Sequence, residues 1–250
     1  MRAIKFIDKE EIKNSLIDIN NSTDIEEEFN EFQNKLLNEI KLMEICENNN
    51  SIKYYEYYNT KKNFIIIMEL CDACLQSLLN ERKNGFNKEE ILEVLNQLNN
   101  TFKIMKDNKI IHRDIKLANI LIKYEDKKKV FKLTDYGISK QLISVSKCYT
   151  HSFGTPLTMA PEVLNEEDYN YKCDLWSLGV IIYQLFFKEY PFKGGNEIAL
   201  LKNINIIINN DGLRKSNDSK LDNLIRHLLI KDPDKRYTWE EYFNDKFFSS

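Results

Sequence analysis

Residues 112–120 read HRDIKLANI and residues 135–137 read DYG, with two short apolar segments between them. Segments 120–123 and 130–133 are separated by a charged turn, and they predict a pair of strands. The two polar motifs therefore occupy loops that flank this strand pair. They contribute two carboxylates, an amine and an amide, from Asp114, Asp135, Lys116 and Asn119.

The chain around these motifs is predicted to be mainly helical in its second part. Residues 89–105 form the clearest amphipathic stretch, and helical patterns dominate after residue 174. Residues 175–187 are apolar on nearly every face, which predicts a helix buried in the middle of a helical lobe.

The first part of the chain has a different pattern. Residues 2–7 predict a strand, a long helix follows, and two more strands are expected around 52–58 and 64–70. Thr23 and Glu26 form a candidate capping box at the start of the helix.

This predicted helix carries an acidic residue on its apolar face. The apolar stripe at helical spacing consists of Phe29, Phe32, Leu36, Ile40 and Met43. Glu39 lies three residues after Leu36 and four before Met43, so its carboxylate shares the buried face. A buried carboxylate requires a compensating charge, so we expect a cationic partner for Glu39.

The composition argues against several classes of protein. The chain has 250 residues, 42% of them hydrophobic, which is enough for a core divided between two lobes. Its 36 basic and 39 acidic residues are mixed along the sequence, so no basic face indicates a nucleic-acid partner. The longest apolar run, residues 180–187, is too short to span a membrane.

Five cysteines without a signal-peptide pattern favour a reducing, cytoplasmic location. Cys71 and Cys74 form a CxxC, which is compatible with a redox pair or half of a zinc site. No second CxxC or nearby histidine pair completes a metal set, so we interpret both as small core or hinge residues.

Taken together, the motifs resemble those of the eukaryotic protein kinase family, over nearly the whole chain. HRDIKLAN followed by DYG and then by APE at residues 160–162 is a specific combination, whereas AIK at residues 3–5 is a short match. Other matching elements are Glu39, MEL at 68–70, GTP at 154–156, DLWSLG at 174–179 and Arg236. The resemblance implies an α+β, two-lobed fold, with a partial small antiparallel-sheet lobe and hinge at 1–70 and a large, mainly helical lobe at 71–250.

The resemblance also implies roles for the polar residues. Asp114 would orient the substrate hydroxyl and accept its proton, and Lys116 would neutralise the moving phosphoryl group. Asn119 and Asp135 would hold Mg²⁺, since an amide oxygen and a carboxylate are hard ligands that suit this ion.

The same resemblance implies the ATP-binding residues of the small lobe and the hinge. Lys5 would pair with Glu39 and contact the first two phosphates of ATP, which would also supply the cation that the buried carboxylate needs. Glu69 and Cys71, at the hinge, are expected to contact ATP as well. The alternative for Lys5 and Glu39 is a solvated strand lysine and a rim glutamate.

Regulation is predicted on the segment between DYG and APE. Arg113 would receive a phosphate carried by Thr150 or Ser152 and added by an upstream kinase. His151 stands where many relatives carry the modified residue, so ordinary loop hydroxyls remain an alternative. Thr155 is expected to contact the catalytic residues.

Two further residues bear on the expected activity. Lys116 after the catalytic aspartate resembles serine/threonine kinases, so the expected substrates are protein serine and threonine hydroxyls. Tyr136 replaces the commoner phenylalanine of the metal-binding triplet, and its hydroxyl needs a partner when buried.

The sequence has no glycine-rich GxGxxG motif before Lys5, because all seven glycines lie at or after Gly85. We expect that two strands of the small lobe are absent, that residues 3–7 form an exposed apolar sheet edge, and that Met1 is an internal methionine of a longer polypeptide. Loss of that loop is expected to weaken ATP binding.

The missing loop keeps a second class of function open, a catalytically impaired pseudokinase or fragment that acts as a binding or scaffold module. Five retained positions, Lys5, Asp114, Lys116, Asn119 and Asp135, favour the enzyme, because a module released from catalysis has no physical need for them. A small-molecule kinase on the related fold is a weaker alternative, since the APE element is typical of relatives that bind peptides.

Overall fold

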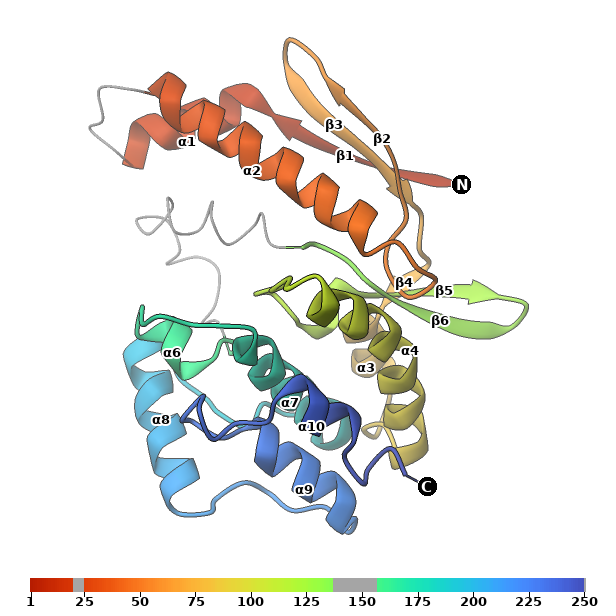
Figure 1. Ribbon diagram of the computed structural model, residues 1–250, viewed down its shortest axis with the longest axis vertical. Coiled ribbons are helices and arrows are strands. Elements are labelled where there is room, and N and C mark those ends of the chain that lie inside the picture. The colour runs from red at the N-terminus through yellow and green to blue at the C-terminus, as the bar shows by residue number, and fades with distance from the viewer. Residues whose placement is uncertain (20–24, 137–156, 250) are drawn as a thin grey trace.

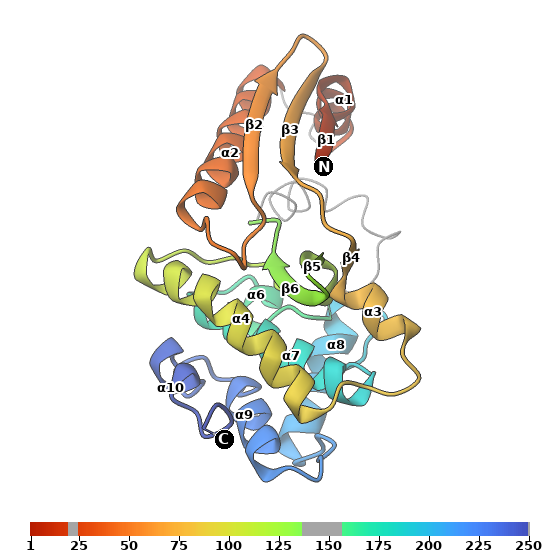
Figure 2. The same ribbon diagram turned by 90° about the vertical axis from the view of Figure 1, so that its right-hand side faces the viewer.

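The computed structural model of the protein describes residues 1–19, 25–136 and 157–249 (Figure 1). Within these ranges the chain forms two three-stranded antiparallel sheets and a group of helices, most of which lie beyond the second sheet (Figure 2). The predicted α+β organisation, with a small sheet lobe and a large helical lobe, is confirmed.

The small lobe combines one sheet with two helices. Its strands are β1 (Arg2–Asp8), β2 (Tyr54–Asn59) and β3 (Asn63–Glu69), in the order β1-β3-β2. Its helices are α1 (Lys9–Ile19) and α2 (Ile25–Ile45), and α2 lies along one face of the sheet in both views (Figures 1 and 2).

Aromatic packing joins α2 to the sheet. The rings of Phe29 and Phe32 on α2 lie 5.9 and 6.2 Å from the ring of Phe64 on β3. The predicted apolar stripe of the helix is therefore its buried face, as all five of its members are buried. Glu39 is buried on the same face, which confirms its predicted placement.

Helix α1 was not predicted as a separate element. Ile12 and Leu16, one helical turn apart, are both buried, and α1 contacts α2. Its short length and mixed composition make a weak helical pattern, and its burial against α2 supplies the stability that the sequence alone does not indicate. The predicted capping residue Thr23 lies outside the described residues.

Strand β1 forms an edge of its sheet among the described residues, where it pairs with β3 alone. Ile4 and Phe6 on this strand are 54% and 63% exposed. The expectation of an apolar exposed edge is confirmed for the part of the chain that the structure describes.

The second sheet lies between the small lobe and the helices (Figure 2). It contains β4 (Ala73–Cys74), β5 (Ile120–Glu125) and β6 (Lys128–Leu133), and the predicted pair β5–β6 is confirmed. The two-residue strand β4 was not predicted. Cys74 ends β4 and caps the next helix, where its Sγ accepts a hydrogen bond from Ser77 N at 3.4 Å, so a structural role accounts for this cysteine.

The large lobe is built around one buried helix. Its elements are α3 (Leu75–Glu81), α4 (Lys88–Asp107), the 3₁₀ turn η1 (Leu117–Asn119), α6 (Pro161–Leu164), α7 (Lys172–Phe187), α8 (Glu197–Asn209), α9 (Ser219–Leu228) and α10 (Trp239–Phe243). Nearly all of α7 is buried, as predicted. Gly179 allows α9 to approach, because a Cβ at this position would lie 2.8 Å from Leu228 Cβ. None of the helices within the described ranges is long and apolar enough to cross a membrane.

Candidate active site

The loop that carries His112, Arg113 and Asp114, which we call the HRD loop, is held by the first turn of the buried helix α7. Asp174, fully buried, accepts a hydrogen bond from His112 N at 2.7 Å and another from Arg113 N at 2.8 Å. Arg113 has a φ of 68°, a conformation that non-glycine residues adopt at a cost. The two bonds to Asp174 hold this strained turn in place.

His112 links the loop to the segment that carries Asp135. Asp114 N donates to His112 Nδ1 at 3.2 Å, so this nitrogen is the acceptor and the ring proton lies on Nε2. Nε2 then donates to Thr134 O at 3.1 Å, and the ring packs against Tyr136 with centroids 5.1 Å apart. The two motifs recognised in the sequence are thus in direct contact.

The Asp114 carboxylate is oriented by two neighbouring side chains. Lys116 Nζ donates to Asp114 Oδ2 at 2.8 Å, and Asn119 Nδ2 donates to the same oxygen at 3.0 Å. Asn119 Nδ2 also donates to Asp114 O at 2.9 Å, which fixes the loop conformation. Asp114 and Asn119 are buried, so the acceptor is held in a defined position.

Asp135 follows the end of β6 in a left-handed conformation, with a φ of 61°. Its carboxylate is partly exposed, and Lys5 Nζ of β1 lies 3.5 Å from its Oδ1. The structure therefore brings the strand lysine to the predicted metal ligand. The predicted contact of Lys5 with Glu39 stays a prediction, and so does the cationic partner of Glu39.

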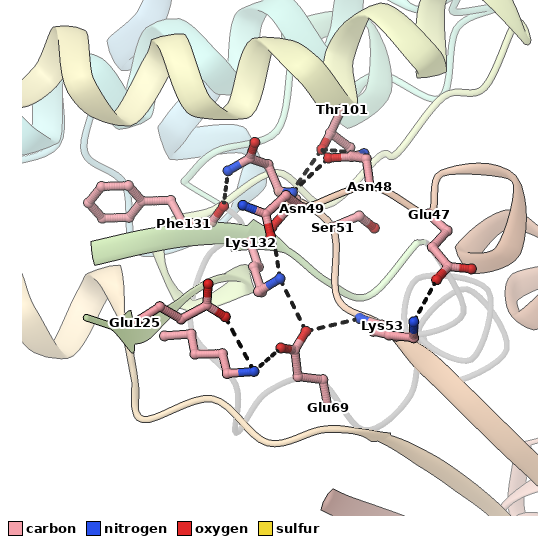
Figure 3. A network of polar contacts seen from close by, with 12 residues as sticks. Glu47, Asn48, Asn49, Ser51, Lys53, Glu69, Thr101, Glu125, Phe131 and Lys132 are labelled. Atoms are coloured by element: carbon pink, nitrogen blue, oxygen red, sulfur yellow. Dashed lines mark hydrogen bonds and ion pairs between the residues drawn. The ribbon is translucent and has the colours of Figure 1, made fainter. Parts of the chain in front are cut away.

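Glu69 joins the hinge to the second sheet through a buried ion network (Figure 3). Lys132 Nζ lies 3.2 Å from Glu69 Oε2, and Lys123 also pairs with Glu69. Burial alone would raise the pKa of the Glu69 carboxyl, yet these two ammonium groups hold it below its usual value. Lys132 Nζ donates further to Asn49 O at 2.7 Å.

This network modifies the expectations for the hinge. The Glu69 side chain is engaged by lysines, and its N–H donates to Lys53 O at 2.8 Å, so contact with a nucleotide is left to other atoms of this residue. Cys71 is partly exposed, and burial raises the pKa of its thiol to about 11. The roles of Glu69 and Cys71 in ATP binding stay predictions.

The predicted regulatory residues are only partly described. Thr150, Ser152 and Thr155 lie outside the described residues. Arg113 has its guanidinium carbon 5.6 Å from the centroid of the Tyr169 ring. The phosphate-receiving role of Arg113 stays a prediction.

The donor set fits the expected cofactor. The amide nitrogen of Asn119 is directed to Asp114, so its amide oxygen is the atom that the predicted metal site would use, together with the carboxylate oxygens of Asp135. No group of three or more His, Cys, Asp or Glu suited to a metal occurs among the described residues. Two protein ligands suit Mg²⁺, which takes its other ligands from water and phosphates.

Two structural residues of this region were not singled out from the sequence. Lys132 lies in an apolar strand segment, and Ser51 lies in a polar loop, so neither stands out by type. The signal for Lys132 is a charged residue at a buried position of the pattern VFKL. Ser51 offers no comparable signal.

Comparisons with known proteins agree with the geometry. The family model described as "Protein kinase domain" matches residues 2–248. Serine/threonine-protein kinase atg1 of Dictyostelium discoideum is 32% identical over 216 residues, which cover 84% of this chain and 32% of that protein. Serine/threonine-protein kinase ATG1a of Arabidopsis thaliana is 30% identical over 223 residues, with 86% and 35% covered.

The chain thus spans about a third of the length of these relatives. The family match, in contrast, extends over both lobes, from β1 to the residues after α10. It includes the HRD loop and the DYG triplet. The chain belongs to the protein kinase domain family.

Proposed function

We propose that this chain catalyses transfer of the γ-phosphoryl group of ATP to serine and threonine hydroxyls of proteins, with Mg²⁺ as the metal. The observation that carries the proposal is the orientation of the buried Asp114 carboxylate by Lys116 and Asn119, with Nζ and Nδ2 at 2.8 and 3.0 Å from the same oxygen. Phosphoryl transfer depends mainly on positioning and on charge neutralisation, and this arrangement supplies both.

Asp114 is the residue that receives the substrate hydroxyl. One Asp114 carboxylate oxygen accepts the hydroxyl proton as the substrate hydroxyl oxygen attacks the γ-phosphoryl group. The Lys116 ammonium stabilises the negative charge that develops on the transferred group. Lys116 is partly exposed, so it reaches the reacting group from the rim of the site.

Asn119 and Asp135 would hold Mg²⁺ through the amide oxygen and the carboxylate. The chemistry that the ion would supply is neutralisation of part of the negative charge on the phosphates. Lys5 lies next to Asp135 and contributes a further positive charge for the phosphates. Hinge contacts to the nucleotide would come from Glu69 and Cys71.

The relatives' printed names support the choice of serine and threonine as acceptors. Lys116 after the catalytic aspartate supports the same choice.

A second candidate is a module that binds nucleotide or protein without phosphoryl transfer. It stays open because Lys5 Nζ lies 3.5 Å from Asp135 Oδ1, so the strand lysine contacts the predicted metal ligand.

The test is transfer of radiolabelled phosphate from ATP to a generic protein substrate, followed by phosphoamino acid analysis. Asp114→Asn should lower the rate by at least about 100-fold, because it removes the proton acceptor. The matched control is Asp107→Asn, at an exposed carboxylate at the end of α4, which should leave the rate unchanged.

The outcomes separate the two candidates. Phosphoserine and phosphothreonine that disappear with Asp114→Asn support the kinase. Nucleotide binding without transfer by the wild-type chain supports the binding module. Phosphotyrosine as the product would contradict the proposed acceptor class.

A further inference from the structure

The hydroxyl of Tyr136 makes a buried contact outside the catalytic loop. Its oxygen lies 2.6 Å from Ser51 Oγ, and both residues are buried. The predicted need for a hydrogen-bond partner at Tyr136 is thus met from the segment that follows α2.

Backbone hydrogen bonds hold the segment around Ser51 against β6. The segment 46–53, which we call the α2–β2 connection, runs beside β6. Ile52 N donates to Leu133 O and Leu133 N donates to Asn50 O, both at 2.9 Å. These two bonds flank Ser51, which forms a parallel bridge with Leu133. The hydroxyl of Ser51 is therefore fixed relative to the end of β6.

Asp135, in contrast, lies beyond the end of its strand. β6 ends at Leu133, and the next backbone bond is from Thr134 N to Asn119 O at 3.0 Å. Asp135 then has a left-handed φ, and its side chain is partly exposed. Fixing the neighbouring ring of Tyr136 is thus a direct way to fix the direction of the Asp135 carboxylate.

The Tyr136 ring is held on two sides. His112 packs against the ring in a tilted arrangement, with a centroid distance of 5.1 Å and an interplanar angle of 50°, and Ser51 contacts its hydroxyl. Packing alone leaves a ring free to slide or tilt within its pocket, whereas a hydrogen bond depends on distance and angle. A phenylalanine would retain the packing and lose the second constraint.

We propose that Ser51 and Tyr136 form a latch that sets the position of the Asp135 carboxylate and so increases the affinity of the site for its divalent metal. Both are positioning residues, since they act through Asp135. The inference rests on the proposed function, because it assumes that Asp135 binds the metal of a nucleotide complex.

A purely structural contact would give a different pattern from a latch. Ser51→Ala leaves the Tyr136 hydroxyl buried with one fewer partner, which destabilises the fold, whereas removing both hydroxyls in the double variant is nearly neutral. Stability should therefore recover in Ser51→Ala/Tyr136→Phe relative to Ser51→Ala. Metal affinity should not recover, because the latch is absent from both variants.

The experiment is titration of the chain with Mn²⁺ in the presence of ADP, with bound and free Mn²⁺ measured by electron paramagnetic resonance. Tyr136→Phe, Ser51→Ala and the double variant should each raise the Mn²⁺ dissociation constant about 3- to 10-fold, the effect of one hydrogen bond on the bound conformation. Urea denaturation of each variant supplies the stability comparison.

The matched control is Tyr242→Phe. Tyr242 is fully buried on α10 and donates from its hydroxyl to Asn99 Oδ1 at 2.9 Å, away from the site. This change should lower the urea midpoint and leave the Mn²⁺ dissociation constant unchanged.

Unchanged Mn²⁺ affinity in Tyr136→Phe and in the double variant would overturn the latch alone. Recovery of affinity together with stability in the double variant would also overturn it, since a structural contact behaves in that way. Failure of the wild-type chain to bind Mn²⁺ with ADP would instead overturn the proposed function and the latch together.

Discussion

Replacing Glu162 by Gln removes the negative charge from the buried ion pair between α6 and the segment before α10. Arg236 NH1 and NH2 donate to the two oxygens of Glu162 at 2.6 and 2.9 Å. Arg236 also donates to the carbonyl oxygens of Ile230, Lys172 and Lys231 at 2.9, 2.8 and 3.2 Å. All five N–H groups of the guanidinium therefore have a partner.

The expected cost follows from burial. The side chains of Arg236 and Glu162 are 0% and 3% exposed, so water cannot solvate the cation when the carboxylate is gone. Breaking a buried pair by removing one charge costs about 3–5 kcal/mol. Glutamine is nearly isosteric and keeps one acceptor, so the loss reflects charge rather than a cavity. For a domain of this size it corresponds to a melting temperature lower by roughly 6–20 °C.

The assay is urea unfolding followed by circular dichroism, with thermal melting as a second measurement. The matched control is Glu31→Gln, which breaks the exposed pair of Glu31 with Lys35 on α2 and should cost about 0.3–0.5 kcal/mol. A loss below about 1 kcal/mol for Glu162→Gln would refute the reasoning, because it would mean that the buried cation is solvated or repaired locally.

Three further predictions follow from the site. Asp174→Asn should lower kcat about 10- to 100-fold with a smaller change in KM, as measured by steady-state phosphate transfer. The reason is that His112 N or Arg113 N loses its acceptor, so that the Asp114 carboxylate shifts. The pKa of the Glu69 carboxyl is lowered in the folded state. Its contribution to stability is therefore present above the unfolded-state pKa near 4.5 and is lost as the pH falls through the folded-state pKa. The urea midpoint of Glu69→Gln should depend less on pH than that of the wild type in this acid range. Cys71, with a pKa of about 11, should react slowly with iodoacetamide at pH 8, and its rate, followed by mass spectrometry, should keep rising as the pH approaches 11; a fast reaction at pH 8 would contradict the burial assigned to it.

The fold was largely predictable because strong local patterns coincide with its main elements. The buried helix α7 and the strand pair β5–β6 were both expected from runs of apolar residues. Helix α1 was missed, because burial of Ile12 and Leu16 depends on contact with α2, which local periodicity does not report. Tertiary contact decides such a weakly patterned segment.

The polar site was predictable to a different degree. Asp114, Lys116 and Asn119 lie within six residues, so one loop brings them together. In the structure Lys116 and Asn119 both donate to the Asp114 carboxylate. The contact of Lys5 with Asp135 was not predicted, and the predicted contact of Lys5 with Glu39 stays a prediction. Distances between lobes depend on the relative position of β1 and β6, which no local pattern determines.

The α2–β2 connection shows why the geometry between the lobes matters for this site. It begins at the end of the helix that carries Glu39, and several of its hydrogen bonds are made with β6 and α4. Asn50 Nδ2 donates to Phe131 O at 3.0 Å, and Thr101 Oγ1 on α4 donates to Asn50 O at 2.9 Å. One end of α2 is therefore fixed to the strand that leads into Asp135. A rotation of α2 about that end would move Glu39 while leaving the connection and β6 in place.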